Sequence, residues 1–250
     1  MIEFVQGAKR VRFFLDYDGT LAEFAATPDE IYPDPELIDL LERLKTHPKY
    51  QVAIISGRRL SHIRKLVPIS GMILAGTYGI EMVDPHGKKI ERVDYQKIRP
   101  GLEGLKSHWA DLIEPHPKFY LEDKGWSLAL HAKFVEEKIA KTILKQAKRV
   151  VFELNISLDE FRVLGGDKFL EVAPKIANKG LTIDFLLSEY PFEDSLLLYV
   201  GDDDKDEEAF EVILKREGIA IKVCPKPCRT AAQLILKSPA DVRKFLHQLL

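Results

Sequence analysis

Two carboxylates and a glycine stand close together near the start of the chain, in the segment Asp16-Tyr17-Asp18-Gly19-Thr20. One carboxylate can attack phosphorus and form an acyl phosphate, and the other can protonate the leaving oxygen and later deprotonate water. The glycine allows a sharp turn that aims backbone amides at an anion. Because Asp and Gly are common turn formers, the segment by itself also fits an aspartate-rich turn.

A hydroxyl and an ammonium group further along the chain suit the same chemistry. In Ser56-Gly57-Arg58 the serine follows an apolar run, and its hydroxyl can hydrogen-bond a phosphoryl oxygen. Lys179 can pair with Asp16 and with the transferring oxygens, which lowers the cost of charge build-up. Each residue also has an ordinary structural interpretation, since serines often cap helices and most lysines lie on the surface.

An acidic run follows a later apolar segment. Residues 201–208 read Gly-Asp-Asp-Asp-Lys-Asp-Glu-Glu, which places six acids in eight positions. These charges repel one another unless a cation neutralises them, and ligand sets made of oxygen select a hard cation such as Mg²⁺. We therefore expect a magnesium site that includes Asp202. The later acids, Glu207 and Glu208, also fit the first turn of a helix, where the helix dipole favours them.

Short apolar runs separated by helical patterns position these groups. The pattern predicts buried strands at residues 11–15, 52–55, 72–75, 196–200 and 219–223, with helices at 35–47, 60–67, 181–187 and 209–214. The alternation predicts a parallel α/β sheet with right-handed crossovers, a Rossmann-like core. Ligands of such sheets bind at the carboxyl ends of the strands, where Asp16, Ser56 and Asp202 fall.

Residues 79–174 show a different pattern. Runs at 80–83 and 89–93 flank Asp84-Pro85-His86-Gly87, which is typical of a hairpin. Helical segments near 100–113 and 135–150 then alternate with strand-like runs at 119–122, 126–131, 161–164 and 169–172. We predict an α/β core made of residues 1–78 and 175–250, interrupted by an inserted α+β cap domain at residues 79–174.

Composition and charge narrow the class of protein. The 250 residues are 46% hydrophobic and 30% charged, with a net charge of −2, which is typical of a globular protein and favours neither nucleic acid nor an anionic membrane as partner. The sequence has no apolar run long enough to span a bilayer and no signal peptide, so we expect a cytoplasmic protein. Cys224 and Cys228 cannot complete a zinc site and are expected to be free thiols. The oligomeric state stays open.

Taken in order, these motifs resemble the haloacid dehalogenase superfamily of phosphatases. Its members carry an Asp-x-Asp-Gly-Thr loop, a Ser or Thr after the second strand, a Lys before a late helix and an acidic Gly-Asp-Asp loop. Within the superfamily the chain is similar to the trehalose-6-phosphate phosphatase family. The segments that carry this similarity are residues 55–58, 74–81, 121–131, 169–174 and 201–207.

The resemblance implies a phosphatase that acts through an aspartyl phosphate. Asp16 would be the nucleophile, and Asp18 would donate a proton to the sugar oxygen and then accept one from water. Ser56 and Lys179 would hold phosphoryl oxygens. The substrate implied is a sugar phosphate, bound in part by the cap domain. The residues expected to bind it are Glu122, Lys124, Glu171, Arg58 and His131.

The resemblance also implies Mg²⁺ as the cofactor. The expected ligands are the carboxylates of Asp16 and Asp202 and the backbone carbonyl of Asp18. Asp206 and Asp203 are expected to act directly or through water, as groups that orient the site. These assignments extend the magnesium site that the acidic run predicts.

Three positions depart from the usual pattern of the family. Tyr78 stands where it usually has His, Lys133 where it has Arg, and Lys205 where it has Thr. The first two lie near the expected sugar pocket, so a different sugar phosphate, such as a phosphorylated glycosyl glycerate, is an alternative substrate. A phosphosugar mutase and a catalytically dead sugar-phosphate sensor are the remaining alternatives.

Overall fold

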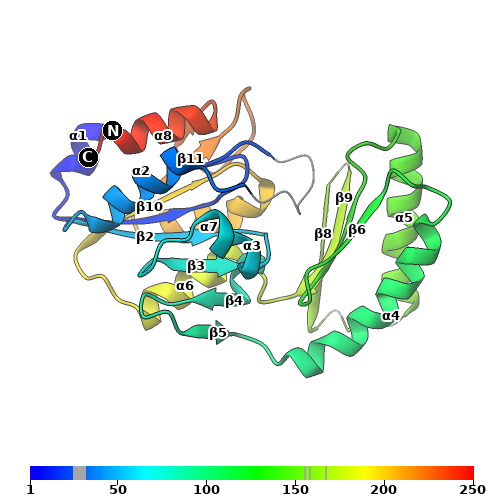
Figure 1. The fold of residues 1–250 in the computed structure, drawn as a ribbon. Helices are drawn as coiled ribbons and strands as arrows, with labels where there is room; N and C mark the ends of the chain where they lie inside the picture. The colour runs from blue at the N-terminus through cyan, green and yellow to red at the C-terminus, as the bar shows by residue number, and fades with distance from the viewer. Residues whose placement is uncertain (25–31, 155, 158, 167) are drawn as a thin grey trace. The chain divides into compact units, whose positions relative to one another are not determined.

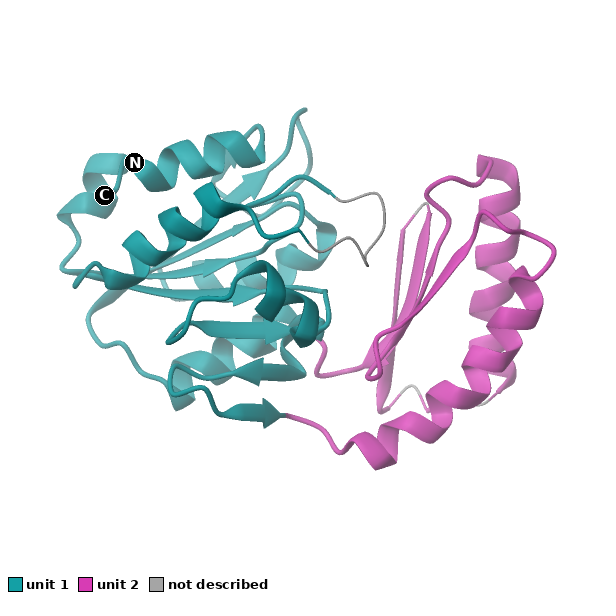
Figure 2. Cartoon of the chain, viewed as in Figure 1, with its two compact units in different colours: residues 1–91, 178–250 teal, residues 92–177 magenta. Residues whose placement is uncertain are grey.

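The chain folds into two compact units. The computed structural model describes residues 1–24, 32–154, 156–157, 159–166 and 168–250 (Figure 1). One unit, the core unit, contains residues 1–91 and 178–250, and the other, the inserted unit, contains residues 92–177 (Figure 2). The chain therefore leaves the core unit once and returns to it.

A mixed sheet of eight strands forms the centre of the core unit. Its order is β12-β11-β10-β1-β2-β3-β4-β5, and the neighbours from β12 to β3 run parallel. The parallel strands are β1 (Arg10–Leu15), β2 (Tyr50–Ile55), β3 (Ile73–Gly76), β10 (Ser195–Gly201), β11 (Ile219–Val223) and β12 (Leu234–Leu236). The predicted parallel core is confirmed, and β12 is an edge strand that the sequence did not indicate.

Helices cover both faces of this sheet. One hydrophobic core receives side chains from α1 (Ile2–Gly7), α2 (Pro35–Thr46), α3 (Leu60–Leu66) and α8 (Pro239–His247), and the other from α6 (Lys179–Glu189) and α7 (Glu207–Leu214). Asp34 begins α2 as an N-cap, because its carboxylate accepts hydrogen bonds from the amides of Glu36 and Leu37. Ser238 begins α8 in the same way.

The hairpin at residues 81–91 belongs to the core unit, which corrects the predicted domain boundary at residue 79. β4 (Glu81–Val83) pairs antiparallel with β3, and β5 (Lys89–Glu91) pairs with β4. Met82 is fully buried in the same hydrophobic core as α6 and α7, and Ile90 packs against it. The turn residues of a hairpin specify its reversal, but the sheet edge that it extends is decided by packing.

The inserted unit is an antiparallel sheet backed by two helices, α4 (Tyr95–Ile113) and α5 (Glu137–Glu153) (Figure 1). The sheet order is β6-β7-β9-β8, from β6 (Tyr120–Asp123), β7 (Leu128–His131), β8 (Phe161–Gly166) and β9 (Phe169–Pro174). Trp109 of α4 is fully buried and donates to the backbone oxygen of Ala147 in α5. α4 begins before the predicted start at Pro100, because Asp94 caps it.

In the core unit, the end of β3 approaches the start of α3 closely, which yields a test of how these two elements pack. A Cβ at Gly76 would lie 2.3 Å from the backbone nitrogen of Leu60 and 2.9 Å from the carbonyl carbon of Arg59, at the start of α3. Because backbone atoms cannot move aside, we expect Gly76→Ala to lower the free energy of unfolding by about 1–3 kcal/mol in urea denaturation. Gly7→Ala, where nothing lies within 4 Å, is the control and should be neutral or slightly stabilising. Equal stability of the two variants would contradict the packing.

Candidate active site

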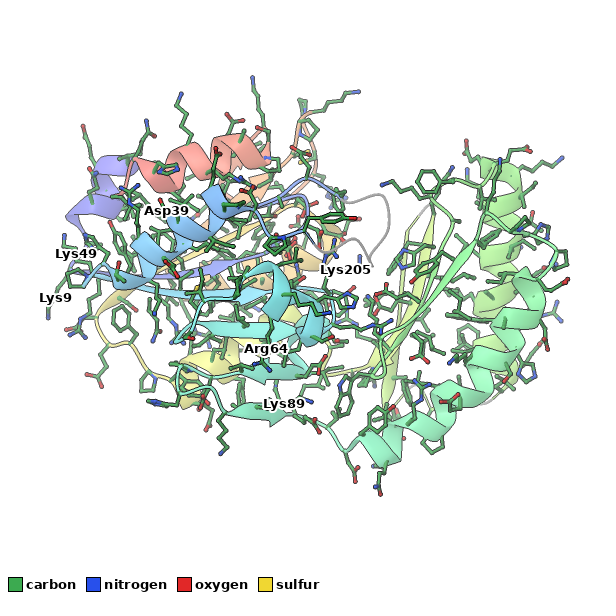
Figure 3. All side chains as sticks on the ribbon, viewed as in Figure 1. Lys9, Asp39, Lys49, Arg64, Lys89 and Lys205 are labelled. Atoms are coloured by element: carbon green, nitrogen blue, oxygen red, sulfur yellow. The ribbon has the colours of Figure 1, made fainter. Side chains whose placement is uncertain are left out.

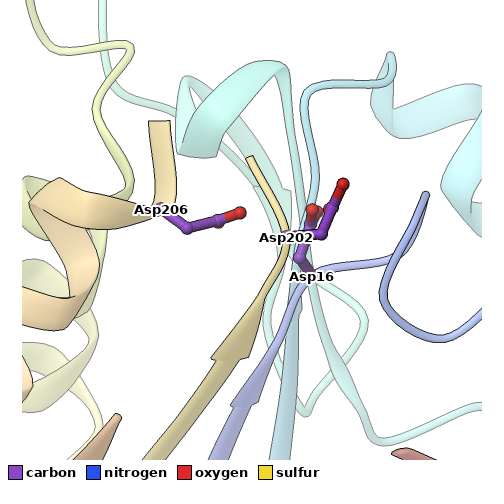
Figure 4. A group of neighbouring side chains, drawn as sticks. All are labelled: Asp16, Asp202 and Asp206. Carbon is purple, nitrogen blue, oxygen red and sulfur yellow. The ribbon is translucent and has the colours of Figure 1, made fainter. Parts of the chain in front are cut away.

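The predicted chemical groups of the core unit meet at one edge of its sheet. β1 lies between β10 and β2 in parallel register, so Asp16, Asp202 and Ser56 follow three adjacent strand ends. Carboxylate oxygens of Asp16, Asp202 and Asp206 all lie within 4.8 Å of one another (Figure 4). Acidic residues from motifs that lie far apart in the sequence are therefore neighbours in the fold.

Lys179 is the cation of this acidic cluster. Its Nζ lies 3.0 Å from Asp16 Oδ1 and 2.6 Å from Asp206 Oδ1, and its side chain is only 3% exposed. α6 begins at Lys179, and Asn178 caps the helix by accepting from the amide of Leu181. The cap fixes the first turn of α6, which places the lysine at the cluster as predicted.

Two approaches of the loops require glycine. Gly19 has φ +73°, and a Cβ there would lie 2.2 Å from Oδ2 of Asp202. A Cβ at Gly201 would lie 2.3 Å from Cγ of Asp206. Thr20 Oγ1 also donates to Oδ1 of Asp202 at 3.2 Å. The Asp16–Thr20 loop and the acidic loop can therefore approach closely only because these positions lack side chains.

Burial and mutual repulsion disturb the ionisation of the cluster. Burial raises the pKa of Asp16 well above its ordinary value, and the charges of Asp206 and Asp202 raise it further, against the attraction of Lys179. Burial and Asp206 together raise the pKa of Asp202 to about 6. Although burial lowers the pKa of Lys179, Asp16 and Asp206 raise it overall. One ammonium group does not balance three carboxylates, two of which are buried, and such a cluster could hold a cation.

Asp206 is fully buried, and hydrogen bonds occupy both of its oxygens. Oδ1 accepts from Lys179 Nζ and from the hydroxyl of Tyr199, each at 2.6 Å, and Oδ2 accepts from the amide of Asp203 at 2.8 Å. Asp206 therefore orients Lys179 and ties the acidic loop to β10. Tyr199 was missed by the sequence reasoning. Its signal was a hydroxyl within the otherwise apolar run Leu196–Val200, because a buried phenol needs a partner.

Asp203 does not join the three-carboxylate cluster. Its side chain accepts from Lys205 Nζ at 2.5 Å and from the amide of Asp204 at 2.6 Å. Lys205, labelled in Figure 3, thus pairs with an acid of its own loop. Lys222, a second residue missed from the sequence, is 4% exposed and donates to the backbone oxygen of Asp203 at 2.8 Å. It supports the acidic loop from the neighbouring strand β11.

Asp18 and Arg58 form a bidentate ion pair. Nε and Nη2 of Arg58 each donate to an oxygen of Asp18 at 2.7 Å. The carboxylate of Asp18 therefore points to Arg58 and stands apart from the cluster of Asp16, Asp202 and Asp206. Arg58, predicted from sequence to bind substrate, is placed beside the predicted acid and base.

The segment after β3 holds the Ser56 loop in place. The amide of Tyr78 donates to the backbone oxygen of Ser56 at 2.9 Å, and that of Thr77 to the oxygen of Arg58 at 2.7 Å. Thr77 and Tyr78 have φ of 47° and 58°, in the left-handed region that residues other than glycine rarely adopt. A Cβ at Gly57 would lie 2.9 Å from the ring of Tyr78. The strained turn thus packs the Tyr78 ring over the loop that carries Ser56.

The polar residues predicted in the inserted unit also come together, on one face of its sheet. Lys124 Nζ donates to Glu171 Oε1 at 3.0 Å, and His131 Nε2 lies 2.9 Å from Glu122 Oε2. Glu122 and Glu171 are 2% and 0% exposed. Ser127, which the sequence reasoning missed, donates to Glu171 Oε1 at 2.6 Å. The predicted substrate-binding residues therefore form two groups, Arg58 in the core unit and this polar patch in the inserted unit.

Known proteins share the sequence pattern over nearly the whole of this chain. The model of the family described as trehalose-phosphatase matches residues 14–240. Trehalose-phosphate phosphatase B of Arabidopsis thaliana is 30% identical over 254 residues, which cover 96% of this chain and 66% of the relative. The chain thus spans slightly less than two thirds of the length of that relative.

Solved structures share the fold. The C-terminal domain of the C. albicans trehalose-6-phosphate phosphatase superposes with a TM-score of 0.87 at 23% identity, covering 99% of this chain and 94% of that one. The C-terminal domain of the Candida albicans trehalose synthase regulatory protein superposes with a TM-score of 0.75 at 12% identity, covering 98% of this chain and 96% of that one.

Among the described residues, none of the helices has both the length and the apolarity needed to cross a bilayer.

The position of Tyr199 yields a test of the cluster. Tyr199→Phe keeps the ring packed on Phe210 but removes a hydrogen bond to the carboxylate of Asp206. We expect a loss of about 1.5–3 kcal/mol in unfolding free energy, and a fall in activity, because the carboxylate that holds Lys179 loses one of its hydrogen bonds. Tyr50→Phe, which removes a buried hydroxyl bound to the oxygen of Leu249, is the control and should spare activity. Equal activity of both variants would show that Tyr199 is not needed to hold the site.

Proposed function

The chain belongs to the trehalose-phosphatase family, and from this membership we propose that it hydrolyses trehalose 6-phosphate to trehalose and phosphate. The observation that carries the proposal is the buried contact of 3.0 Å between Lys179 and Asp16, at the carboxyl edge of a parallel sheet. A nucleophilic carboxylate must be able to reach phosphorus, and a cation beside it stabilises the negative charge that develops in the transition state. Asp16 can serve as that carboxylate and Lys179 as that cation. Both groups are present at one point.

Asp16 attacks phosphorus in line and becomes an aspartyl phosphate, while the bond between phosphorus and the sugar oxygen breaks. Lys179 neutralises charge on the transferring oxygens, and Asp206 keeps its ammonium group in place through the 2.6 Å hydrogen bond. Ser56 Oγ, on a buried side chain, donates a further hydrogen bond to a phosphoryl oxygen. Water then attacks phosphorus and releases phosphate, which restores the carboxylate of Asp16.

Asp18 moves the proton in both halves of the reaction. It donates to the departing sugar oxygen and afterwards accepts a proton from the attacking water. In the structure its carboxylate is bound by Arg58, at 2.7 Å through two nitrogens. Arg58 must therefore release at least one oxygen of Asp18 before the carboxyl group can donate. A phosphate dianion is a competing partner for the guanidinium, which fits the expected role of Arg58 in binding the substrate.

The acidic cluster fits Mg²⁺. Asp16 and Asp202 would supply carboxylate oxygens and Asp18 its backbone carbonyl, and Asp206 and Asp203 would orient the loop. Carboxylate oxygens of three residues within 4.8 Å of one another support this assignment, and the raised pKa values of Asp16 and Asp202 agree with it. A bound Mg²⁺ would polarise the phosphoryl group and neutralise its charge.

The inserted unit provides the sugar site in this proposal, as the cap domain of the enzyme. Glu122, Lys124 and Glu171 offer carboxylate and ammonium groups to sugar hydroxyls, and His131 is held by Glu122. Because a buried ion pair adds little to stability by itself, recognition is a better account of the Lys124–Glu171 pair than folding. We also propose a reducing, cytoplasmic location, since Cys224 and Cys228 are free thiols.

A panel of phosphate esters tests the activity. Wild-type protein with Mg²⁺ should release free phosphate from trehalose 6-phosphate, and Asp16→Asn should lower turnover by about 10⁴-fold or more, because no nucleophile remains. Asp39→Asn, an exposed aspartate on α2, is the control and should behave as wild type.

The same panel separates the alternatives. Release of phosphate from another sugar phosphate, but not from trehalose 6-phosphate, would replace the proposed substrate and keep the chemistry. An isomeric sugar phosphate without free phosphate would indicate a mutase. Binding without turnover of any ester would indicate a sensor.

The metal site yields a prediction that does not depend on activity. The pKa of Asp202 rises from 3.8 to about 6, so the stability that its protonated form contributes is present below pH 4 and is lost as the pH rises through 6. Mg²⁺ replaces that proton. We therefore expect Mg²⁺ to raise the thermal midpoint more at pH 7.5 than at pH 5, and to add about 2.7 kcal/mol at a hundredfold excess over its Kd.

Two asparagine variants sharpen the measurement. Asp202→Asn should lose the response to Mg²⁺, whereas Asp204→Asn, which removes an exposed charge from the same loop, should keep most of it. A response that is independent of pH and equal in both variants would place the ion elsewhere on the protein.

A further inference from the structure

An aromatic row crosses three strands of the inserted unit beside the polar patch. Tyr120 of β6, His131 of β7 and Phe169 of β9 are direct cross-strand partners. The ring centroids of Tyr120 and His131 are 5.8 Å apart and those of His131 and Phe169 are 5.2 Å apart, with the planes tilted by 41° and 59°. All three side chains are half-buried. The row is therefore a continuous strip of rings with part of its surface open to solvent.

This row lies on the same face of the sheet as the carboxylates of the polar patch. Side chains alternate between faces along a strand, so Tyr120 shares a face with Glu122, and Phe169 with Glu171. The contact between His131 and Glu122 shows the same arrangement directly. The opposite face, with Leu121, Leu128, Leu130, Leu170 and Val172, packs against α4 and α5. The rings are thus placed where the carboxylates are and away from the hydrophobic core of the unit.

The combination of rings and carboxylates on one face suits a pyranose. Tyr120 and Phe169 stand two residues along their strands from Glu122 and Glu171, which corresponds to about 6.8 Å. A pyranose ring has an apolar face of C–H bonds and a rim of hydroxyl groups. The weakly negative face of an aromatic ring attracts such C–H bonds, and carboxylates accept hydrogen bonds from the rim. Sites for small polar ligands commonly combine aromatic surface with a few fixed polar groups in this way.

We propose that Tyr120, His131 and Phe169 form a stacking platform for one sugar ring of the substrate, with its rim hydroxyls bound by Glu122 and Glu171. The proposal deepens the proposed function, on which it rests, because it assigns the chemical class of the group that the inserted unit takes: a pyranose ring beyond the phosphorylated one. The hydrogen bond between Glu122 and His131 fixes the central ring, so the platform is formed before the sugar arrives.

Two leucine variants test the platform. Phe169→Leu and Tyr120→Leu keep most of the apolar area but remove a flat ring. We expect each to raise KM for trehalose 6-phosphate by about three- to tenfold with little change in kcat, and to leave KM for a small aryl phosphate unchanged. Phe152→Leu is the control, since Phe152 is an aromatic residue of α5 in the same unit and is 50% exposed. It should change neither substrate. Thermal midpoints of all variants should stay close to wild type.

Binding of trehalose itself separates this proposal from the proposed function. Calorimetry should detect weaker binding of trehalose to Phe169→Leu than to wild type, whether or not the wild type hydrolyses trehalose 6-phosphate. If wild type turns over another glycosyl phosphate, the same leucine variants should raise its KM. Unchanged KM and unchanged disaccharide binding in both variants would overturn the platform. An equal rise in KM for aryl and sugar phosphates would also overturn it, because a small ester does not carry the second ring.

Discussion

Closely spaced like charges set the main constraint on the core unit. Asp16, Asp202 and Asp206 have carboxylate oxygens within 4.8 Å of one another, and the ammonium group of Lys179 lies 3.0 Å from the first and 2.6 Å from the last. Like charges this close raise the pKa of one another, and a cation beside them favours their ionised forms. α6 supplies such a cation, since the helix begins at Lys179. Arg12 holds the other end of α6 by donating to the backbone oxygens of Leu186 and Tyr190.

The loops then have to fit around that cluster, and glycines allow them to do so. Gly19 and Gly201 leave room for the carboxylates of Asp202 and Asp206, and Gly180 lies where a Cβ would come within 2.5 Å of the backbone oxygen of Glu208. These close approaches hold together the segments that carry the acids and the lysine. Close packing of these backbone segments therefore fixes the positions of the side chains that they carry.

The inserted unit also buries charged groups and pairs them with one another. Its sheet has one apolar face under α4 and α5 and one face that carries buried charge. Lys124 and Ser127 satisfy Glu171, and His131 satisfies Glu122, so the charged groups keep partners without a ligand. A sugar hydroxyl can use the remaining lone pairs of these carboxylates without breaking those hydrogen bonds. The aromatic row adds an apolar surface, which the carboxylates cannot supply.

Local patterns in the sequence determined the type of most elements and the residues with chemical potential. Apolar runs and helical spacing are properties of short segments, so the strands around Asp16, Ser56 and Asp202 were predictable. So was Lys179, which the family resemblance placed at the start of a helix. The acidic run predicted a cation site for the same reason, because charge density can be counted along the chain.

Tertiary structure decided the contacts that strand ends and family motifs did not predict. The sequence could not show that the hairpin at β4 and β5 extends the core sheet, that Asp203 turns to Lys205, or that Asp18 pairs with Arg58. Nor could it show that Tyr199 binds Asp206, or that Tyr120 and Phe169 line up on either side of His131. These contacts join residues brought together by strand register and by the direction of side chains. Such properties depend on how distant segments pack, and no local pattern encodes them.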